Sequence, residues 1–301
     1  MMRMDVGLIR ARAAEGGDSK ETADLESAIK RQGHHATDIH IDTVGVSMTE
    51  NGVQLFQLPG ARRIDIDCAI LRTLGIIKDY EQFSHRIWAV RAIEMNGITV
   101  VNSLMQWLAA SDKLAALAFL SSNGLPVPDT VSSENFMISY NAAKEFGSVV
   151  VKPLRSSMGL GVFKLDDPDV AMHTFSYLVN LNKPIYVQRY LEKIGGGDYR
   201  VIVVGNAAIG AEYRRGKTWK SNVAQGAVAR AARLNAELQE LSVKAAEVLG
   251  LDYVGVDIAE TKDGYVILET NPSIKWQAFR EATGINPAEH IVRHLISKAR
   301  R

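Results

Sequence analysis

The chain has 301 residues, of which 47% are apolar, and its 35 basic and 34 acidic residues leave a formal net charge of +1. This balance provides no global electrostatic attraction to nucleic acid or to an anionic membrane, so we expect neither as a partner. The single cysteine, Cys68, excludes an intrachain disulfide, and no apolar run is long enough for a signal peptide or a membrane span. We therefore expect a cytoplasmic protein whose length suits two or three packed parts.

The first hundred residues predict alternating strands and helices. Short apolar runs predict strands at 5–9, 68–72 and 98–103. Helical spacing of apolar residues predicts helices over 19–32 and 79–95. This alternation favours an open α/β layer.

The pattern changes after residue 103. A helix is expected to begin at Ser111-Asp112 and to end before Gly124, and two more are expected over 235–250 and 287–300. From about residue 130 the chain is expected to be rich in strands, at 148–154, 161–165, 184–191, 199–205, 207–215, 253–260 and 264–270.

The strongest chemical pattern is the pair of runs VGVDIAE and GYVILETNPS. Asp257 lies within one strand, and Glu269 and Asn271, two residues apart, share a face at the end of its expected partner. Two carboxylates and an amide oxygen form the set of hard ligands that magnesium uses to hold nucleotide phosphates. A solvent-facing Asp257 beside a turn at Asn271 is the structural alternative. Because an acidic residue inside an apolar strand costs free energy unless it is paired or metal-bound, the pattern favours a site.

A glycine-containing loop in KPLRSSMGLGVFKL is a second candidate. Lys152 ends an apolar strand, and the loop with Gly159 and Gly161 could place backbone N–H groups against phosphates. An ordinary hairpin uses glycine in the same way, so this pattern alone leaves both interpretations open.

Two further segments could bind a nucleotide. The strand end at Gln188, Tyr190 and Leu191 could present backbone groups to an adenine edge, and Asp198 and Arg200 follow a glycine run. A flexible loop with a surface ion pair is the alternative. A basic cluster in AEYRRGKTWKSNVAQGA is either an anion site or a solvated loop, and its residues are Arg214, Arg215, Lys217 and Lys220, followed by Ser221 and Asn222.

The order of the motifs carries a resemblance to a known family. SDK (111–113), GLPVPDT (124–130), VVKPLRSSMGLGV (150–162) and YVQRYLEKIGGGDYRVIVVG (186–205) are followed by SNVAQGA, VDIAE and ETNPS. Together they resemble the ATP-grasp superfamily and, within it, the RimK-like α-L-glutamate ligases, over roughly residues 1–295.

The resemblance implies an α/β (α+β) ATP-grasp fold in three parts. These are an N-terminal Rossmann-like pre-ATP-grasp domain in residues 1–103, a central subdomain in 104–187 and a C-terminal subdomain in 188–301. ATP would be held between the last two.

The resemblance also implies roles for matching positions. Binding of ATP would fall to Lys113, Lys152, Gln188, Arg189, Tyr190, Leu191 and Asp198. The catalytic residues that orient the phosphates or the acceptor carboxylate would be Arg200, Arg214 and Asn222. Two magnesium or manganese ions would be bound by Asp257, Glu269 and Asn271.

The implied reaction has two steps and uses ATP as co-substrate. A substrate carboxylate takes the γ-phosphoryl group to give an acylphosphate and ADP, and the amine of L-glutamate then displaces phosphate. The acceptors of relatives are pterin or deazaflavin coenzymes, a ribosomal-protein C-terminus or an acidic carrier protein. The run RTLG (72–75) and the helix after it resemble the coenzyme ligases, with Arg72 expected to hold an anionic acceptor.

Tetrahydromethanopterin is accordingly the first acceptor hypothesis, and a protein acceptor is the second. A non-catalytic nucleotide-binding module is the alternative from a different class. The sequence leaves open a homo-oligomer, the choice between ATP and GTP, and whether glutamate is the amine.

Overall fold

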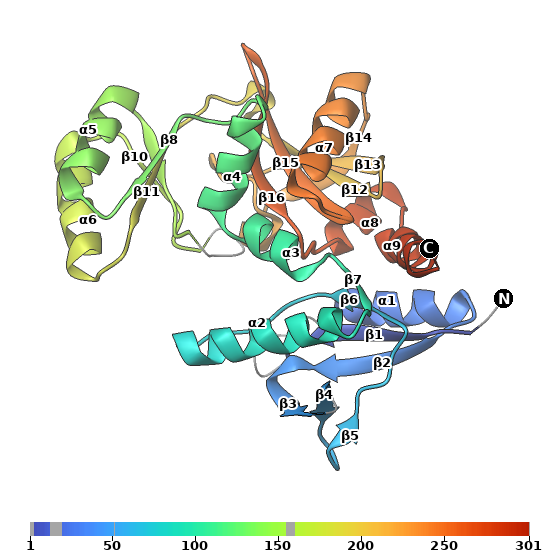
Figure 1. The fold of residues 1–301 in the computed structure, drawn as a ribbon. Helices are drawn as coiled ribbons and strands as arrows, with labels where there is room; N and C mark the ends of the chain where they lie inside the picture. Colours follow the sequence, from blue (N-terminus) through green and yellow to red (C-terminus); the bar gives the residue numbers. More distant parts are fainter. Residues whose placement is uncertain (1–2, 13–19, 51, 155–159, 301) are drawn as a thin grey trace.

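The computed structural model describes residues 3–12, 20–50, 52–154 and 160–300 (Figure 1). Its N-terminal part is built on a parallel sheet of four strands in the order β2-β1-β6-β7. The predicted alternation is confirmed, although Ser19, expected to begin the first helix, lies outside the described residues. The elements are β1 (Asp5–Arg10), α1 (Lys20–Arg31), β2 (His35–His40), β6 (Cys68–Leu71), α2 (Tyr80–Met95) and β7 (Thr99–Val101).

A small antiparallel sheet, which the sequence pattern does not predict, packs against α2. It follows a 3-10 turn at Ile41–Thr43 and consists of β3 (Val44–Thr49), β4 (Gly52–Gln57) and β5 (Arg62–Arg63). Only one residue in each of β3 and β4 is buried. The apolar alternation that would reveal such strands is therefore weak.

The central part is an antiparallel sheet in the order β10-β9-β11-β8. Two helices, α5 (Phe136–Phe146) and α6 (Pro168–Asn180), cover its outer face (Figure 1). The sequence reading omits both helices. Helix α5 buries only small residues and so gives little apolar periodicity, whereas α6 buries Ala171 and Phe175. The strands are β8 (Thr130–Ser133), β9 (Val149–Val151), β10 (Phe163–Leu165) and β11 (Ile185–Arg189).

The C-terminal part is an antiparallel sheet of five strands in the order β14-β13-β12-β15-β16. One face, including Val201 and Val254, packs against α7 (Ala236–Leu249). The opposite face packs in part against α8 (Gln277–Thr283) and α9 (Pro287–Ala299). The strands are β12 (Asp198–Val204), β13 (Ala207–Arg215), β14 (Val228–Ala232), β15 (Tyr253–Thr261) and β16 (Gly264–Asn271), with 3-10 turns at Ile194–Gly196 and Val223–Gln225.

Two short helices join the N-terminal sheet to the rest of the chain. The predicted helix is α4 (Lys113–Ser122), and α3 (Leu104–Ser111), which the sequence reading omits, precedes it. Asp112 separates the two, and its side chain accepts hydrogen bonds from the backbone N–H groups at the start of α4. This places Lys113 at the first turn of α4.

The limits of the three predicted parts, 1–103, 104–187 and 188–301, stay a prediction. The boundary between residues 187 and 188 falls within β11, whose residues all pair within the central sheet. Helix α9 packs against α1, β6 and β7, so the end of the chain covers the N-terminal sheet. Among the described residues, no helix combines the length and apolar character that crossing a membrane requires.

Asn102, directly after β7, ties the N-terminal sheet to the C-terminal one. Its side chain is fully buried. The Nδ2 group donates to the carbonyl oxygens of Tyr253 (2.8 Å) and Pro272 (3.2 Å). The Oδ1 atom accepts from the backbone N–H groups of Asp252 (2.7 Å) and Tyr253 (3.0 Å).

We expect Asn102→Ala to lower the free energy of unfolding by about 2–4 kcal/mol, because it leaves buried backbone groups without partners. Urea unfolding followed by tryptophan fluorescence measures the change. Asn141→Ala, at an exposed position of α5, is the matched control and should change stability by less than about 0.5 kcal/mol. Equal effects of the two substitutions would contradict the role of Asn102.

Candidate active site

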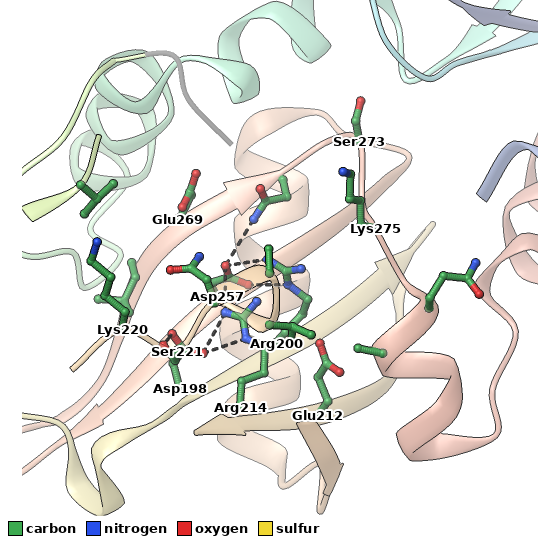
Figure 2. Close-up of a pocket in the computed structure, with 18 of the residues that line it drawn as sticks. Asp198, Arg200, Glu212, Arg214, Lys220, Ser221, Asp257, Glu269, Ser273 and Lys275 are labelled. Carbon is green, nitrogen blue, oxygen red and sulfur yellow. Dashed lines mark hydrogen bonds and ion pairs between the residues drawn. The ribbon is translucent and has the colours of Figure 1, made fainter. Parts of the chain in front are cut away.

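Four charged residues stand in register across the C-terminal sheet. Glu212 of β13 pairs with Arg200 of β12, and Arg200 pairs on its other side with Asp257 of β15. Asp257 in turn pairs with Glu269 of β16. Directly paired residues point to the same face of a sheet, so the four side chains form one row (Figure 2). Within it, Arg200 makes a bidentate pair with Asp257, with both N···O distances 2.8 Å.

A β-bulge brings Glu269 into this row. Ile258 pairs with Ile267, and the next pair is Asp257 with Glu269, so Leu268 is the extra residue. In an unbroken strand Glu269 would share a face with Ile267, which is fully buried in the core. The bulge therefore turns the Glu269 side chain toward the face that carries Asp257.

A second charged pair lies beside the row on the same face. Arg214 of β13 pairs with Asp198 of β12, and its Nη2 lies 2.8 Å from Asp198 Oδ1 and 3.0 Å from Asp257 Oδ2. Ser221 donates a hydrogen bond to Asp198, and Lys193 Nζ lies 3.8 Å from the same carboxylate. Arg214 thus joins the two carboxylates into one buried network.

The two arginines control the charge of Asp257. Burial alone would raise the pKa of Asp257, but Arg200 and Arg214 outweigh burial and hold this pKa at about 2. Burial likewise opposes the charge on Arg214, yet Asp257 and Asp198 raise its pKa. Asp257 is therefore an anion at neutral pH.

Two lysines face the row from other elements. Lys113 Nζ of α4 lies 3.4 Å from Glu269 Oε1. Lys152, just after β9, donates to Gln188 Oε1 at 2.6 Å. Burial lowers the pKa of Lys152 to about 8, and the positive charges of Lys113 and Lys193 act in the same direction, against the opposing effect of Glu269.

These side chains line a cavity of about 610 Å³. It is formed by the C-terminal sheet, by α4 and by residues of the central part such as Lys152 and Val162. Nine of the residues predicted from the sequence meet in it: Lys113, Lys152, Asp198, Arg200, Arg214, Asn222, Asp257, Glu269 and Asn271.

The four predicted hinge residues, Gln188 to Leu191, do not line this cavity. Gln188 nevertheless accepts a hydrogen bond from Lys152, which lines the cavity, and it donates one to Thr130 Oγ1 at 3.1 Å. The backbone N–H groups of Arg189 and Tyr190 are occupied within the central part, by the carbonyl oxygens of Asp129 and Ser148. Of the predicted phosphate loop, Gly159 lies outside the described residues, whereas Gly161 has a φ of +70°.

The predicted basic cluster does not act as one unit. Arg214 is buried in the network, whereas Arg215 and Lys217 are exposed and do not line the cavity. Strand alternation explains why Arg215 leaves the face that carries Arg214, because neighbouring residues of β13 point to opposite faces, and Lys217 lies beyond the end of the strand. Lys220 and Asn222, beyond the strand, return to the cavity wall.

Arg72 is also placed differently from the prediction of an acceptor-binding residue. It is 1% exposed, its Nη2 donates to the carbonyl oxygen of Ile274 at 2.9 Å, and its guanidinium lies 4.8 Å from the centre of the Trp276 ring. The side chain therefore packs the N-terminal sheet onto the C-terminal part. In this structure it is not presented to a ligand.

The oxygen donors fit a hard divalent cation. Asp257 and Glu269 face one another across paired strands, and Asn271 Nδ2 lies 3.4 Å from Asp257 Oδ2. Within the described residues no group of three or more His, Cys, Asp or Glu side chains could hold a metal by itself. One or two carboxylates supplemented by substrate phosphates are, however, the usual protein ligands of magnesium.

The sequence reading misses Lys193 and Glu212 as residues of the site. Glu212 is two residues before Arg214, so strand alternation in AAIGAEYRR would have placed both on one face. Lys193 lies in the segment between β11 and β12, where no periodic pattern exists to orient it.

We expect Arg214→Ala to destabilise the protein by about 3–5 kcal/mol at pH 7, because it leaves Asp198 and Asp257 buried with too little positive charge. The pKa of Asp257 is below its ordinary value, so its ion pairs stabilise the fold above pH 4, and this contribution is lost as the pH falls from 4 toward 2. The difference between variant and wild type should therefore shrink over that range in urea unfolding. Arg230→Ala, at an exposed position of β14, should show a small, pH-independent change. A constant difference for Arg214→Ala would contradict the assignment.

Comparison with known proteins identifies the family. Residues 110–295 match the model of the RimK-like ATP-grasp domain. The chain is 31% identical over 289 residues to tetrahydromethanopterin:alpha-L-glutamate ligase of Methanosarcina acetivorans, covering 86% of this chain and 89% of that protein. A Marinomonas protein named probable alpha-L-glutamate ligase is 33% identical over 210 residues, covering 68% of this chain and 70% of its own length.

Solved structures agree in fold. The RimK domain ATP-grasp protein of Sphaerobacter thermophilus superposes with a TM-score of 0.73 at 22% identity, covering 98% of this chain and all of that one. The ATP-grasp ligase PsnB, in a complex with a precursor variant, magnesium and ADP, gives a TM-score of 0.75 at 20% identity, covering 99% of both chains. The chain therefore has the ATP-grasp fold, belongs to the RimK-like ATP-grasp family of α-L-glutamate ligases, and is an ATP-dependent ligase.

Proposed function

We propose that the protein adds L-glutamate to a carboxylate of tetrahydromethanopterin through an acylphosphate formed from ATP. One observation carries the reaction type: three oxygen donors, Asp257, Glu269 and Asn271, share a single cavity with two lysines and two arginines. The acceptor rests on the similarity to the Methanosarcina acetivorans ligase, which extends over 86% of the chain.

Asp257, Glu269 and Asn271 would hold the divalent cations, magnesium or manganese. Two such ions, when bound, would neutralise charge on the nucleotide phosphates. Asp257 can accept a metal while keeping its arginine partners, because an ionised carboxylate offers about four lone-pair sites.

Lysine and arginine side chains of the protein would supply the remaining positive charge around the phosphates. Lys113 and Lys152 would contact the phosphates from the Glu269 side of the cavity, and Arg200 and Arg214 would lie along the opposite side. Positive groups held in place before the reaction stabilise a transferring phosphoryl group without reorganising. We assign the adenine and ribose side of ATP to Gln188, Arg189, Tyr190, Leu191 and Asp198, and a further phosphate or acceptor contact to Asn222.

In the first step an acceptor carboxylate oxygen forms a bond to the γ-phosphorus, and the bond from that phosphorus to the ADP oxygen breaks. In the second step the neutral amine nitrogen bonds to the acyl carbon, the carbon–oxygen bond to phosphate breaks, and the nitrogen loses a proton to the departing phosphate. Neither step needs a nucleophilic side chain.

We expect Glu269→Gln to lower the rate of ADP release at least about 100-fold when L-glutamate and acceptor are both present, because it removes an anionic ligand of the metal. A coupled ADP assay, run with magnesium and separately with manganese, measures the effect. Glu240→Gln, at an exposed position of α7, should leave the rate within twofold of wild type. An unchanged rate in Glu269→Gln would remove Glu269 from the site.

Mass spectrometry should find one glutamate added to tetrahydromethanopterin. A deazaflavin coenzyme, a peptide carrying a protein C-terminus and a carrier protein are the competing acceptors. PsnB is solved with a precursor peptide, so peptides belong in the same assay. If only one of these competing acceptors gains glutamate, that acceptor replaces tetrahydromethanopterin in the proposal. Nucleotide binding without ADP release for any acceptor would favour a non-catalytic module.

A further inference from the structure

One buried carboxylate that lines the cavity is not among the residues proposed to bind ATP or metal. Glu212 is 1% exposed and lines the cavity. Its Oε2 atom is buried and has no hydrogen-bond partner among the described residues. In Figure 2 it lies beyond Arg200 from Glu269, and no dashed line reaches it.

The other acidic residues of the cavity differ from Glu212 in this respect. Each of the remaining four has a partner within the protein: Asp198 with Arg214, Asp257 with Arg200, Glu269 with Lys113, and Glu21 with the backbone N–H of Trp276. Glu212 is therefore the acidic group that the protein leaves to be satisfied from the cavity.

Leaving such a group without a partner is costly. Burial raises the pKa of Glu212, and Arg200 and Arg214 only partly offset that effect. A ligand that brings a positive charge and N–H donors would remove the penalty, since charge-assisted hydrogen bonds are about twice as strong as neutral ones.

The position of Glu212 suits a second substrate rather than ATP. It pairs with Arg200, which pairs with Asp257, so its backbone lies two strands from the proposed metal ligand. At about 4.8 Å per strand this is about 10 Å. A group bound there would lie beside the phosphoryl site, separated from it by the Arg200 side chain.

We propose that Glu212 binds the ammonium group of the amino-acid co-substrate. This inference rests on the proposed function, in which an amine attacks the acylphosphate, and it adds the residue that holds the protonated amine before attack. The ammonium group gives up one proton, for which the Glu212 carboxylate is an acceptor, and its nitrogen can then attack. Lys20 and Lys275 line the same cavity and supply positive charge for the carboxylates of an amino diacid such as L-glutamate.

The decisive comparison is between L-glutamate and glutarate, which differ in the ammonium group. Calorimetric titrations into the full-length protein, with magnesium and a non-hydrolysable ATP analogue, measure both affinities. The wild type should bind L-glutamate about 10- to 100-fold more tightly than glutarate. Glu212→Gln, which keeps the size of the side chain, should lose this preference without weaker glutarate binding, and Glu212→Asp should recover part of it.

The control is Glu281→Gln, which removes an exposed carboxylate from α8 and should preserve the preference. If Glu212→Gln lowers the affinities for L-glutamate and for glutarate equally, Glu212 only supports the structure. An unchanged preference in that variant, or a wild type without one, would overturn the proposal.

A second assay separates this inference from the proposed function. Hydroxylamine is a small nucleophile that is neutral at pH 8, so it can trap an acylphosphate as a hydroxamate without an ammonium site. Glu212→Gln should form the acceptor hydroxamate with ATP at a rate within about threefold of wild type, while amide formation with L-glutamate falls in line with the affinity. If the wild type forms no hydroxamate with any acceptor, the proposed function is rejected. The binding role of Glu212 is tested separately by the titrations, which do not depend on the reaction.

Discussion

Burial of charge on one face of the C-terminal sheet is the constraint on which the site depends. Arg200 stands between two acidic residues in register, and Arg214 closes a second contact to Asp257. Isolated ions in this position would be strongly unfavourable, and Asp257 and Asp198 are accordingly paired with Arg200 and Arg214. Strand register places these partners next to one another, so the spacing of the row is set by the sheet and not by loops. The result is a row of charges along one wall of the cavity.

The N-terminal part contributes through contacts at the other end of the same sheet. Asn102 holds the loop before β15, and Arg72 packs on Trp276 just before α8. On α1, Asp24 accepts hydrogen bonds from the Trp276 and Gln277 side chains. The wall of the cavity that carries Lys275 and Gln277 is thus positioned by a part of the chain more than 200 residues earlier. The N-terminal part therefore supports one wall of the cavity.

Prediction from sequence succeeded where burial is strong and regular. Strands such as β1 and β6 are nearly continuous apolar runs, and α4 has an Asp112 cap that is visible in the sequence. It failed for α5, which buries mainly small residues, and for the partly exposed small sheet formed by β3, β4 and β5. Part of the packing comes from elements later in the chain, α6 and β11 for α5 and α2 for the small sheet, so the local pattern carries little information.

For the site, the sequence by itself determined which residue types could do the chemistry. Asp257 in an apolar strand, with Glu269 and Asn271 in the strand that follows, identified two neighbouring strands that carry oxygen ligands. The order of motifs identified the family. Only the tertiary structure decided which side chains meet. The bulge at Leu268 turns Glu269 to the face of Asp257, and burial removes Arg72 from ligand contact. Arg200 donates to Asp257, and Glu212 Oε2 is left without a hydrogen-bond partner among the described residues. These outcomes depend on strand pairing and on desolvation by distant segments, which are properties of the folded chain and not of any local run of residues.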